Sequence, residues 1–121
     1  RDLAGCTAVQ AALIDALGLP RPQWRHHLLL MEPQGGKFAK FHGAVGGDTL
    51  RRRYTPQALC GLLATVAGLR EEASPCQPTD LLPDFTWDKV RRRDQVLAWD
   101  GRDLIHQGEG EATWTDTLCA G

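Results

Sequence analysis

A short apolar run, His27 to Met31, limits the possible folds of this chain more than any other segment. A run of this length without polar alternation is typical of a strand buried on both faces in a parallel sheet. A helix is predicted before it, at 7–17, and the Pro-Arg-Pro segment 20–22 is predicted to be an extended connector between the two. Helix, connector and buried strand together predict half of an α/β unit.

The helix predicted at 7–17 depends on its start, its apolar spacing and its stop. Thr7 and Gln10 have the spacing of a capping box, in which two side chains satisfy backbone N–H groups at a helix start. Gly18 supplies a left-handed stop and Pro20 blocks continuation. Between these ends the apolar residues recur at helical spacing: Val9, Leu13, Ala16 and Leu17.

Two lysines, Lys37 and Lys40, follow the apolar run in the glycine-flanked loop 35–43. Glycines let the backbone approach a ligand closely, and each lysine ammonium is a mobile point charge that suits phosphate oxygens. Both lysines are therefore candidate phosphate-binding residues. The alternative is a basic surface turn, because short basic motifs often occur without any ligand.

Two helices are predicted after this loop. Asp48 is a candidate cap for a short basic helix that carries Arg51, Arg52 and Arg53. Thr55 and the proline after it then open the clearest helix of the chain, which has an apolar stripe and stops at Gly68. We expect this second helix to pack on a core.

The last part of the chain predicts a small hairpin. A surface loop over 71–83, with one helical turn after Thr79, and a basic helical turn near Trp87 precede it. The dipeptide at 100–101, Asp-Gly, stands between two apolar runs, which is a strong hairpin signal. From Gly108 onward we expect a loosely ordered tail, except where Trp114 docks.

Composition indicates one globular domain, or a large piece of one, in a chain of 121 residues of which 42% are hydrophobic. The formal net charge is −1, so binding to a polyanion must come from local clusters such as the basic segment 37–53. No apolar run approaches the roughly 20 residues that span a bilayer. We therefore expect a soluble, cytoplasmic protein without membrane contact.

Because the chain starts at Arg1 and its single methionine is Met31, we also expect it to be a fragment of a longer protein.

The four cysteines are widely spaced, and no pair has the short spacing of a zinc knuckle or a redox dithiol. They are predicted to be free thiols: Cys6, Cys60, Cys76 and Cys119. His26 and His27 point to opposite faces of an extended segment, so we do not expect them to share a metal ion.

Four segments, taken in order along the chain, match one family. Segment 1–10 and the "ALG…P…HLLL" pattern over 16–30 come first, followed by Lys-Phe-Ala-Lys-Phe at 37–41 and the Thr-Pro helix at 55–63. Their order resembles the glutamyl type of class I aminoacyl-tRNA synthetase, a family that includes glutamyl-Q tRNA(Asp) synthetase. Segment 37–41 falls where that family carries its Lys-Leu-Ser-Lys-Arg signature.

The resemblance implies a fold in three parts. Residues 1–47 would be the second half of a Rossmann-like nucleotide fold, including the signature loop 35–43. Residues 48–95 would be a mainly helical region that contacts the tRNA acceptor stem, and residues 96–121 a small terminal hairpin and tail. The chain would thus be an α/β fragment of a ligase that activates glutamate with ATP and transfers it to tRNA or to a tRNA nucleoside.

The resemblance also implies site residues. Lys37 and Lys40 would be catalytic and would contact the phosphates of ATP, which is expected to carry Mg²⁺. Asp2 would lie near the ribose, and backbone groups near Leu29 and Leu30 would face adenine. Acceptor-stem contacts are expected from Arg51, Arg52 and Arg53, for which a solvated helix face is the alternative.

Three departures from the family pattern limit what this segment can do alone. Ala39 replaces the serine of the signature, and Phe41 stands where a basic or hydroxyl side chain is usual. The first half of the nucleotide fold, with its His-Ile-Gly-His signature, is absent from the sequence, so the fragment is expected to be inactive by itself and to need no zinc. Uncovered apolar surface makes self-association of the fragment an expectation. The competing interpretation is a non-catalytic RNA- or protein-binding module derived from a synthetase.

Overall fold

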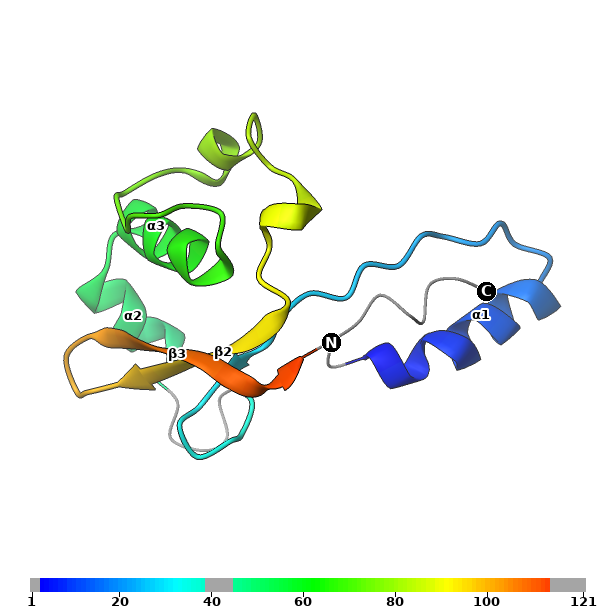
Figure 1. The fold of residues 1–121 in the computed structure, drawn as a ribbon, viewed down its shortest axis with the longest axis horizontal. Coiled ribbons are helices and arrows are strands. Elements are labelled where there is room, and N and C mark those ends of the chain that lie inside the picture. Colours follow the sequence, from blue (N-terminus) through cyan, green and yellow to red (C-terminus); the bar gives the residue numbers. More distant parts are fainter. Residues whose placement is uncertain (1–2, 39–44, 114–121) are drawn as a thin grey trace.

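The computed structural model describes residues 3–38 and 45–113, with side chains described as far as residue 110. It contains one three-stranded sheet in the order β1–β2–β3 (Figure 1). β1 (Leu30–Met31) runs parallel to β2 (Arg93–Trp99), and β2 runs antiparallel to β3 (Leu104–Thr113). The chain is thus a small α/β fragment, as the sequence predicts, and the hairpin strands join β1 in one mixed sheet. None of the described helices has the length and hydropathy needed to cross a bilayer.

The first helix, α1 (Thr7–Ala16), forms where it is predicted, but it does not start in the predicted way. It continues from a 3₁₀ turn, η1 (Ala4–Cys6), and no side chain caps its first turn. The Thr7 hydroxyl is instead hydrogen-bonded to Nε2 of His26 at 2.9 Å. The predicted capping box is therefore wrong, because Thr7 has a partner on the extended segment that returns along α1. The helix does end near Gly18, whose φ is 64°.

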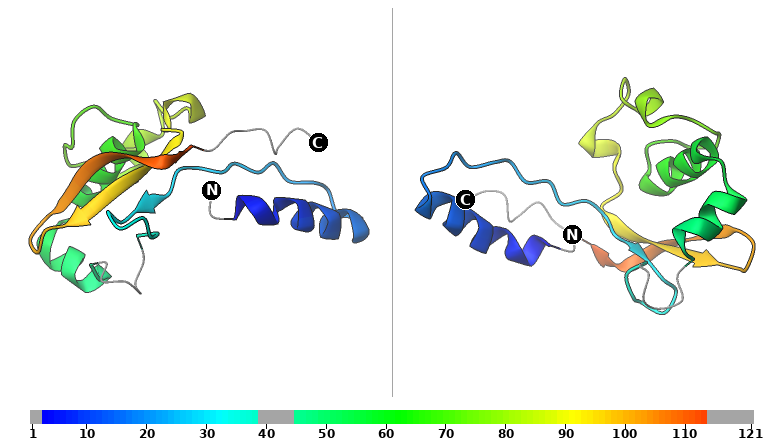
Figure 2. Two further views of the ribbon diagram at one scale, coloured as in Figure 1. Left: turned by 60° about the horizontal axis from the view of Figure 1, so that its bottom comes forward. Right: turned by 180° about the vertical axis from the view of Figure 1, so that it is seen from behind.

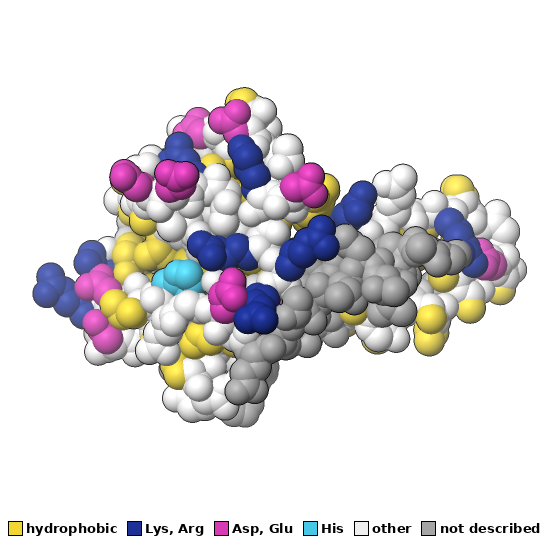
Figure 3. Space-filling view, viewed as in Figure 1, with side chains coloured by type: hydrophobic (Ala, Val, Ile, Leu, Met, Phe, Trp, Pro, Cys, Tyr) yellow, Lys and Arg dark blue, Asp and Glu magenta, His cyan; other side chains and the backbone are white. Residues whose placement is uncertain are grey.

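The apolar side of α1 is exposed. Val9, Leu13 and Leu17 keep 73%, 60% and 63% of their surface in contact with solvent. Figure 2 shows in both views that α1 lies apart from α2 and α3, with the extended segment that follows it running alongside, and Figure 3 shows apolar side chains standing out on α1. Within the described residues, the helical spacing of these side chains therefore produces a helix without a covering layer.

The apolar run 27–31 is less buried than the sequence predicts. Only its last two residues form a strand, and β1 lies at an edge of the sheet with β2 as its neighbouring strand. Leu28 is buried, while Leu29, Leu30 and Met31 are half-buried. The prediction of a strand buried on both faces is wrong, because β1 has only two residues and both remain half-buried at the edge of the sheet.

Both helices predicted after the lysine loop are present, the first as a short helix and the second as a longer one. α2 (Gly47–Arg53) starts from Gly46, and Asp48 lies within its first turn rather than at the cap position. α3 (Pro56–Ala67) is capped as predicted, since the Thr55 hydroxyl accepts a hydrogen bond from the Ala58 amide at 3.2 Å. It ends at Gly68 in the left-handed conformation, with φ of 86°.

The region after α3 contains two 3₁₀ turns, η2 (Pro78–Leu81) and η3 (Trp87–Lys89). The predicted hairpin is present, with Gly101 at a φ of 98° in its turn. β3 extends to Thr113, so the prediction of a loose tail from Gly108 is wrong for 108–113, while Trp114 lies outside the described residues. The hydrophobic core joins α3 to the sheet, and its buried members are Leu28, Ala64, Val66, Cys76, Leu97 and Leu104.

Candidate functional site

A cavity of about 470 Å³ lies between the apolar run 27–31, the C-terminal half of α3 and the turn around η3. Three of the residues expected to bind nucleotide line it: Leu29, Leu30 and Lys37. The other lining residues are His27, Leu28, Phe38, Leu63, Ala67, Leu69, Phe85, Trp87 and Val90. The cavity is therefore a mainly apolar space, and Lys37 and His27 are its two lining residues with ionisable side chains.

Lys37 reaches this cavity because the chain reverses tightly after β1. The Glu32 amide donates to the Gly36 carbonyl at 2.7 Å, and the Gly35 amide donates to the Glu32 carbonyl at 2.9 Å. Gly35 has a φ of 88°, which a side chain would disfavour, so the glycine is needed for this turn. The reversal places Lys37 opposite Met31 in an isolated antiparallel bridge. The second signature lysine, Lys40, and the departures at 39 and 41 lie outside the described residues.

The backbone of Leu29 is already engaged within the protein. Its amide donates to Oδ1 of Asp94 at 2.9 Å, and its carbonyl accepts from the Gln95 amide at 2.9 Å. The Leu30 carbonyl accepts from the Phe38 amide at 2.8 Å. These bonds hold the cavity wall in place, so the leucine side chains are the groups that a ligand in the cavity would meet first. Asp2, the expected ribose contact, lies outside the described residues.

The three arginines of α2 have different surroundings. Arg51 pairs with Asp48 at 2.7 Å, but both side chains are about four-fifths exposed. Nε of Arg52 donates to the Asp48 carbonyl at 3.4 Å, a long hydrogen bond on an exposed side chain. These two side chains can still be reached from solvent. None of the three arginines lines the cavity.

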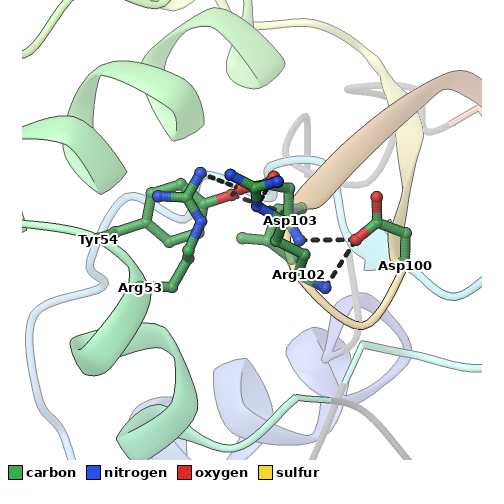
Figure 4. A network of polar contacts seen from close by, with 6 residues as sticks. Arg53, Tyr54, Asp100, Arg102 and Asp103 are labelled. Carbon is green, nitrogen blue, oxygen red and sulfur yellow. Dashed lines mark hydrogen bonds and ion pairs between the residues drawn. The ribbon is translucent and has the colours of Figure 1, made fainter.

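Arg53 is held in a network that joins α2 to the hairpin turn (Figure 4). Its guanidinium pairs with Oδ1 of Asp103 at 2.5 Å and lies 5.1 Å from the centre of the Tyr54 ring. The Tyr54 hydroxyl donates to Asp103 at 3.2 Å and accepts from the Leu104 amide at 2.8 Å. Arg53 thus pairs with a residue of the hairpin turn, whereas the contacts of Arg51 and Arg52 with Asp48 stay within α2.

The hairpin turn that carries this network is itself stabilised by Asp100. Its Oδ1 accepts hydrogen bonds from the amides of Asp103 and Arg102 at 2.6 and 2.8 Å. These two amides, that of Asp103 most strongly, lower the pKa of the Asp100 carboxyl. The turn geometry therefore depends on a charged carboxylate, which in turn places Asp103 toward α2.

The histidines of the described chain have separate partners. His26 contacts Thr7, and Nδ1 of His27 is hydrogen-bonded to the Leu28 carbonyl at 2.7 Å. Nε2 of His106 is hydrogen-bonded to Oε1 of Gln95 at 2.8 Å. Desolvation, and to a lesser degree the nearby Arg91 charge, lower the pKa of His106. Among the side chains that the structure describes, in 3–38 and 45–110, no three His, Cys, Asp or Glu residues group as a metal site would require.

Several wall residues were not expected at a functional site. Leu63 and Ala67 come from the apolar side of α3, whose spacing predicts packing without showing what it packs against. Phe85 and Trp87 meet edge to face with ring centres 5.3 Å apart. Aromatic residues in a loop of otherwise polar composition are the one sequence signal that could have indicated this wall.

Comparison with known proteins defines the family. No family model matches the chain. A glutamyl-Q tRNA(Asp) synthetase of Symbiobacterium thermophilum is 38% identical over 92 residues, which cover 75% of this chain and 28% of that protein. A second glutamyl-Q tRNA(Asp) synthetase, of Nitratidesulfovibrio vulgaris, is 32% identical over 108 residues, 88% of this chain and 33% of that protein. A glutamate–tRNA ligase 2 of Syntrophus aciditrophicus is 29% identical over 108 residues, 84% of this chain and 22% of that protein.

All three relatives are named as synthetases or ligases of tRNA, and the aligned segment includes most of the α/β fragment with its lysine turn. The chain belongs to the glutamyl-type aminoacyl-tRNA synthetase family, as the resemblance in its motifs predicts. It spans 22–33% of the length of these three relatives.

Proposed function

We propose that this chain is part of a glutamyl-tRNA synthetase-type ligase, in which it supplies the loop that contacts the ATP phosphates and a surface for the tRNA acceptor stem. The parent would activate glutamate with ATP and transfer it to tRNA or to a tRNA nucleoside. The observation that carries the proposal is the common cavity of Leu29, Leu30 and Lys37. Family membership supports the reaction class, while the roles of single residues rest on this geometry.

The chemistry of the cavity suits adenylate formation. Attack of a carboxylate on the α-phosphate of ATP builds negative charge on the phosphate oxygens, and catalysis of such a step depends mainly on positioned positive charge. The Lys37 ammonium would supply such a charge beside leucine side chains that exclude water. Lys40 would supply a second positive charge. Low local dielectric strengthens this interaction. ATP is expected to enter with Mg²⁺ on its phosphates.

The exposed side of α1 supports the assignment to a larger nucleotide fold. Val9, Leu13 and Leu17 form an apolar strip that is more than half exposed, and burying such side chains is worth about 2 kcal/mol each. In the parent, the remaining part of a Rossmann-like fold would cover this strip. This segment would then be the second half of that fold, and it would not activate glutamate by itself.

For the tRNA contact, Arg51 and Arg52 are the better candidates. All three arginines are exposed, but Arg53 is held by Asp103 and Tyr54, which lie outside α2. An exposed guanidinium can exchange a weak surface pair for a phosphate at little cost. We therefore assign phosphate contact to the first two arginines and a mainly structural role to the third.

A second candidate function is a non-catalytic module that binds RNA or a partner protein. Its support is the replacement of the signature serine by Ala39 and of the following basic position by Phe41. Loss of the serine hydroxyl removes a group that can order the loop or bind phosphate. Under this function the basic surface would be used while the ATP site would not.

The experiment that separates the two functions is glutamate-dependent ATP–pyrophosphate exchange by the complete parent protein. Exchange in the wild type, with a decrease of about 100-fold in Lys37→Ala, is expected if the lysine stabilises developing charge. Lys89→Ala is the matched control, because its ammonium donates to the Asp84 carbonyl on the surface. No exchange by the intact parent would rule out the ligase function and leave the binding module.

A further inference from the structure

Two thiols that the sequence separates lie in contact. Cys60 is on α3, and Cys76 is in the connection that follows the helix. Their Sγ atoms are 3.8 Å apart, with the Cys76 thiol donating toward the Cys60 sulfur. Cys76 is 5% exposed and Cys60 is half-buried. Hydrogen peroxide could therefore reach the Cys60 sulfur from solvent, while the buried Cys76 sulfur stays in contact with it.

The backbone around the pair is held in this arrangement. A Cβ atom on Gly61 would lie 2.0 Å from the Ser74 carbonyl oxygen, so α3 and the connection touch at the residue next to Cys60. The Cys76 amide donates to the Gln57 carbonyl at 3.1 Å. Nη1 of Arg70 donates to the hydroxyl and the carbonyl of Ser74 at 3.0 and 3.3 Å. Main-chain contacts thus hold α3 and the connection together on either side of the two sulfurs.

We propose that hydrogen peroxide oxidises Cys60 and Cys76 to an intramolecular disulfide, which ties α3 to the connection after it. The Cys60 thiolate attacks one oxygen of hydrogen peroxide, becomes a sulfenic acid and releases hydroxide, which takes up the thiol proton as water. The Cys76 sulfur then attacks the sulfenic sulfur, the S–O bond breaks, and a second water leaves. Two thiols and one peroxide become one disulfide and two waters.

The geometry requires a small movement. A disulfide has an S–S distance of about 2.05 Å, so the sulfurs must approach by about 1.8 Å from their present 3.8 Å. The bond would close a loop between positions 60 and 76, a length at which cross-links stabilise folded chains measurably.

The rate of the first step depends on the charges around Cys60. Desolvation raises the pKa of its thiol, and the neighbouring Cys76 raises it further. Among the charged groups nearby, Arg70 opposes this shift and Asp80 adds to it. Oxidation is therefore expected to be slow at neutral pH and faster at mildly alkaline pH, since the thiolate is the nucleophile.

The test is to treat the full chain with hydrogen peroxide, alkylate the remaining thiols, and map the peptides by mass spectrometry without reduction. We expect a linked Cys60–Cys76 peptide that has lost two hydrogens, while the exposed Cys6 is recovered in alkylated form. Cys6→Ser should leave the linked peptide unchanged, and Cys60→Ser should abolish it. Three outcomes would overturn the proposal. They are sulfinic or sulfonic acid at Cys60, cross-links of Cys60 or Cys76 to another chain, and recovery of both Cys60 and Cys76 as alkylated thiols after oxidation. The wild-type map decides the question even if a variant does not fold.

Thermal unfolding tests whether the folded chain accommodates the bond. The oxidised wild type should unfold about 5 °C or more above the reduced form, and Cys60→Ser should show no such difference. A linked chain that unfolds at a lower temperature than the reduced one would show that the bond strains the native structure, which contradicts the proposal. The inference does not depend on the proposed ligase function.

Discussion

The amide of Leu29 donates a hydrogen bond to Oδ1 of Asp94 at 2.9 Å, which joins the apolar run before the lysine turn to the start of β2. Asp94 is 1% exposed, so this bond is made away from water. The next amide along β2, that of Gln95, donates back to the Leu29 carbonyl at 2.9 Å. These two bonds position one wall of the cavity, and therefore the turn that carries Lys37.

Replacing Asp94 by alanine should lower the free energy of unfolding by about 2 kcal/mol, because the half-buried Leu29 amide would lose its acceptor. Urea unfolding of the full chain measures this change. Asp94→Asn keeps an acceptor oxygen and should cost less. The matched control is Asp84→Ala, whose side chain is exposed. Equal stabilities for the Asp94 and Asp84 alanine variants would contradict the role given to the Leu29–Asp94 bond.

Gly61→Ala should destabilise the chain by about 2 kcal/mol, although alanine favours helices over glycine by about 1 kcal/mol. The reason is steric, since the new Cβ would lie 2.0 Å from the Ser74 carbonyl oxygen, which is a backbone atom. Gly5→Ala is the control, because nothing lies within 4 Å of a Cβ built there. Thermal unfolding of both variants gives the comparison. A more stable Gly61→Ala chain would show that α3 and the connection are not in close contact.

Tyr54→Phe should cost about 1–2 kcal/mol, because the Leu104 amide loses its acceptor and Asp103 loses a donor. Arg51→Ala, which removes an exposed ion pair of α2, should change the free energy of unfolding by less than about 0.5 kcal/mol. Chemical denaturation distinguishes the two. Similar losses in both variants would mean that the contact between α2 and the hairpin contributes little to stability.

Arg52→Ala in the complete parent should weaken tRNA binding and reduce the slope of log Kd against log salt by about 0.7–0.9, the value for one lost phosphate contact. Titrations at several salt concentrations measure both quantities. Arg102→Ala is the control, since this arginine is exposed on the hairpin turn and not on α2. Unchanged binding and slope in Arg52→Ala would assign this arginine to a solvated helix face.

Acidification should destabilise the chain partly through His106. Its pKa in the folded chain lies below the usual value of 6.5, so the unfolded chain binds the proton more readily. The stability contributed by neutral His106 is complete above pH 6.5 and is lost as the pH falls from there toward the folded pKa. His106→Gln should therefore show a flatter stability profile below pH 6.5 than the wild type. Parallel profiles would refute a contribution from this histidine.

Local signals in the sequence predict most of the individual elements. Thr55 and Gly68 mark both ends of α3, and the Asp100–Gly101 turn predicts the hairpin, because caps and turns depend on residues close together in sequence. The prediction at Thr7 is wrong although its motif is regular. Its hydroxyl meets His26, a partner that the capping-box spacing does not include.

The candidate site is predicted less completely. The lysine turn and the leucines before it stand out in the sequence, and Leu29, Leu30 and Lys37 do line one cavity. The opposite wall, from α3 and the Phe85–Trp87 turn, could not be predicted, because it depends on how distant segments pack. The same applies to Arg53. It is one of three consecutive arginines, and its ion pair with Asp103 of the hairpin distinguishes it from the other two.

The sequence by itself determined the family, the glycine turn after an apolar run, and the ends of α3, because these depend on motif order and on backbone preferences of neighbouring residues. The tertiary structure decided that β1 pairs with β2, that Cys60 meets Cys76, and which arginine of α2 is held. Contacts between distant segments arise from the burial and packing of whole surfaces, which no local pattern specifies.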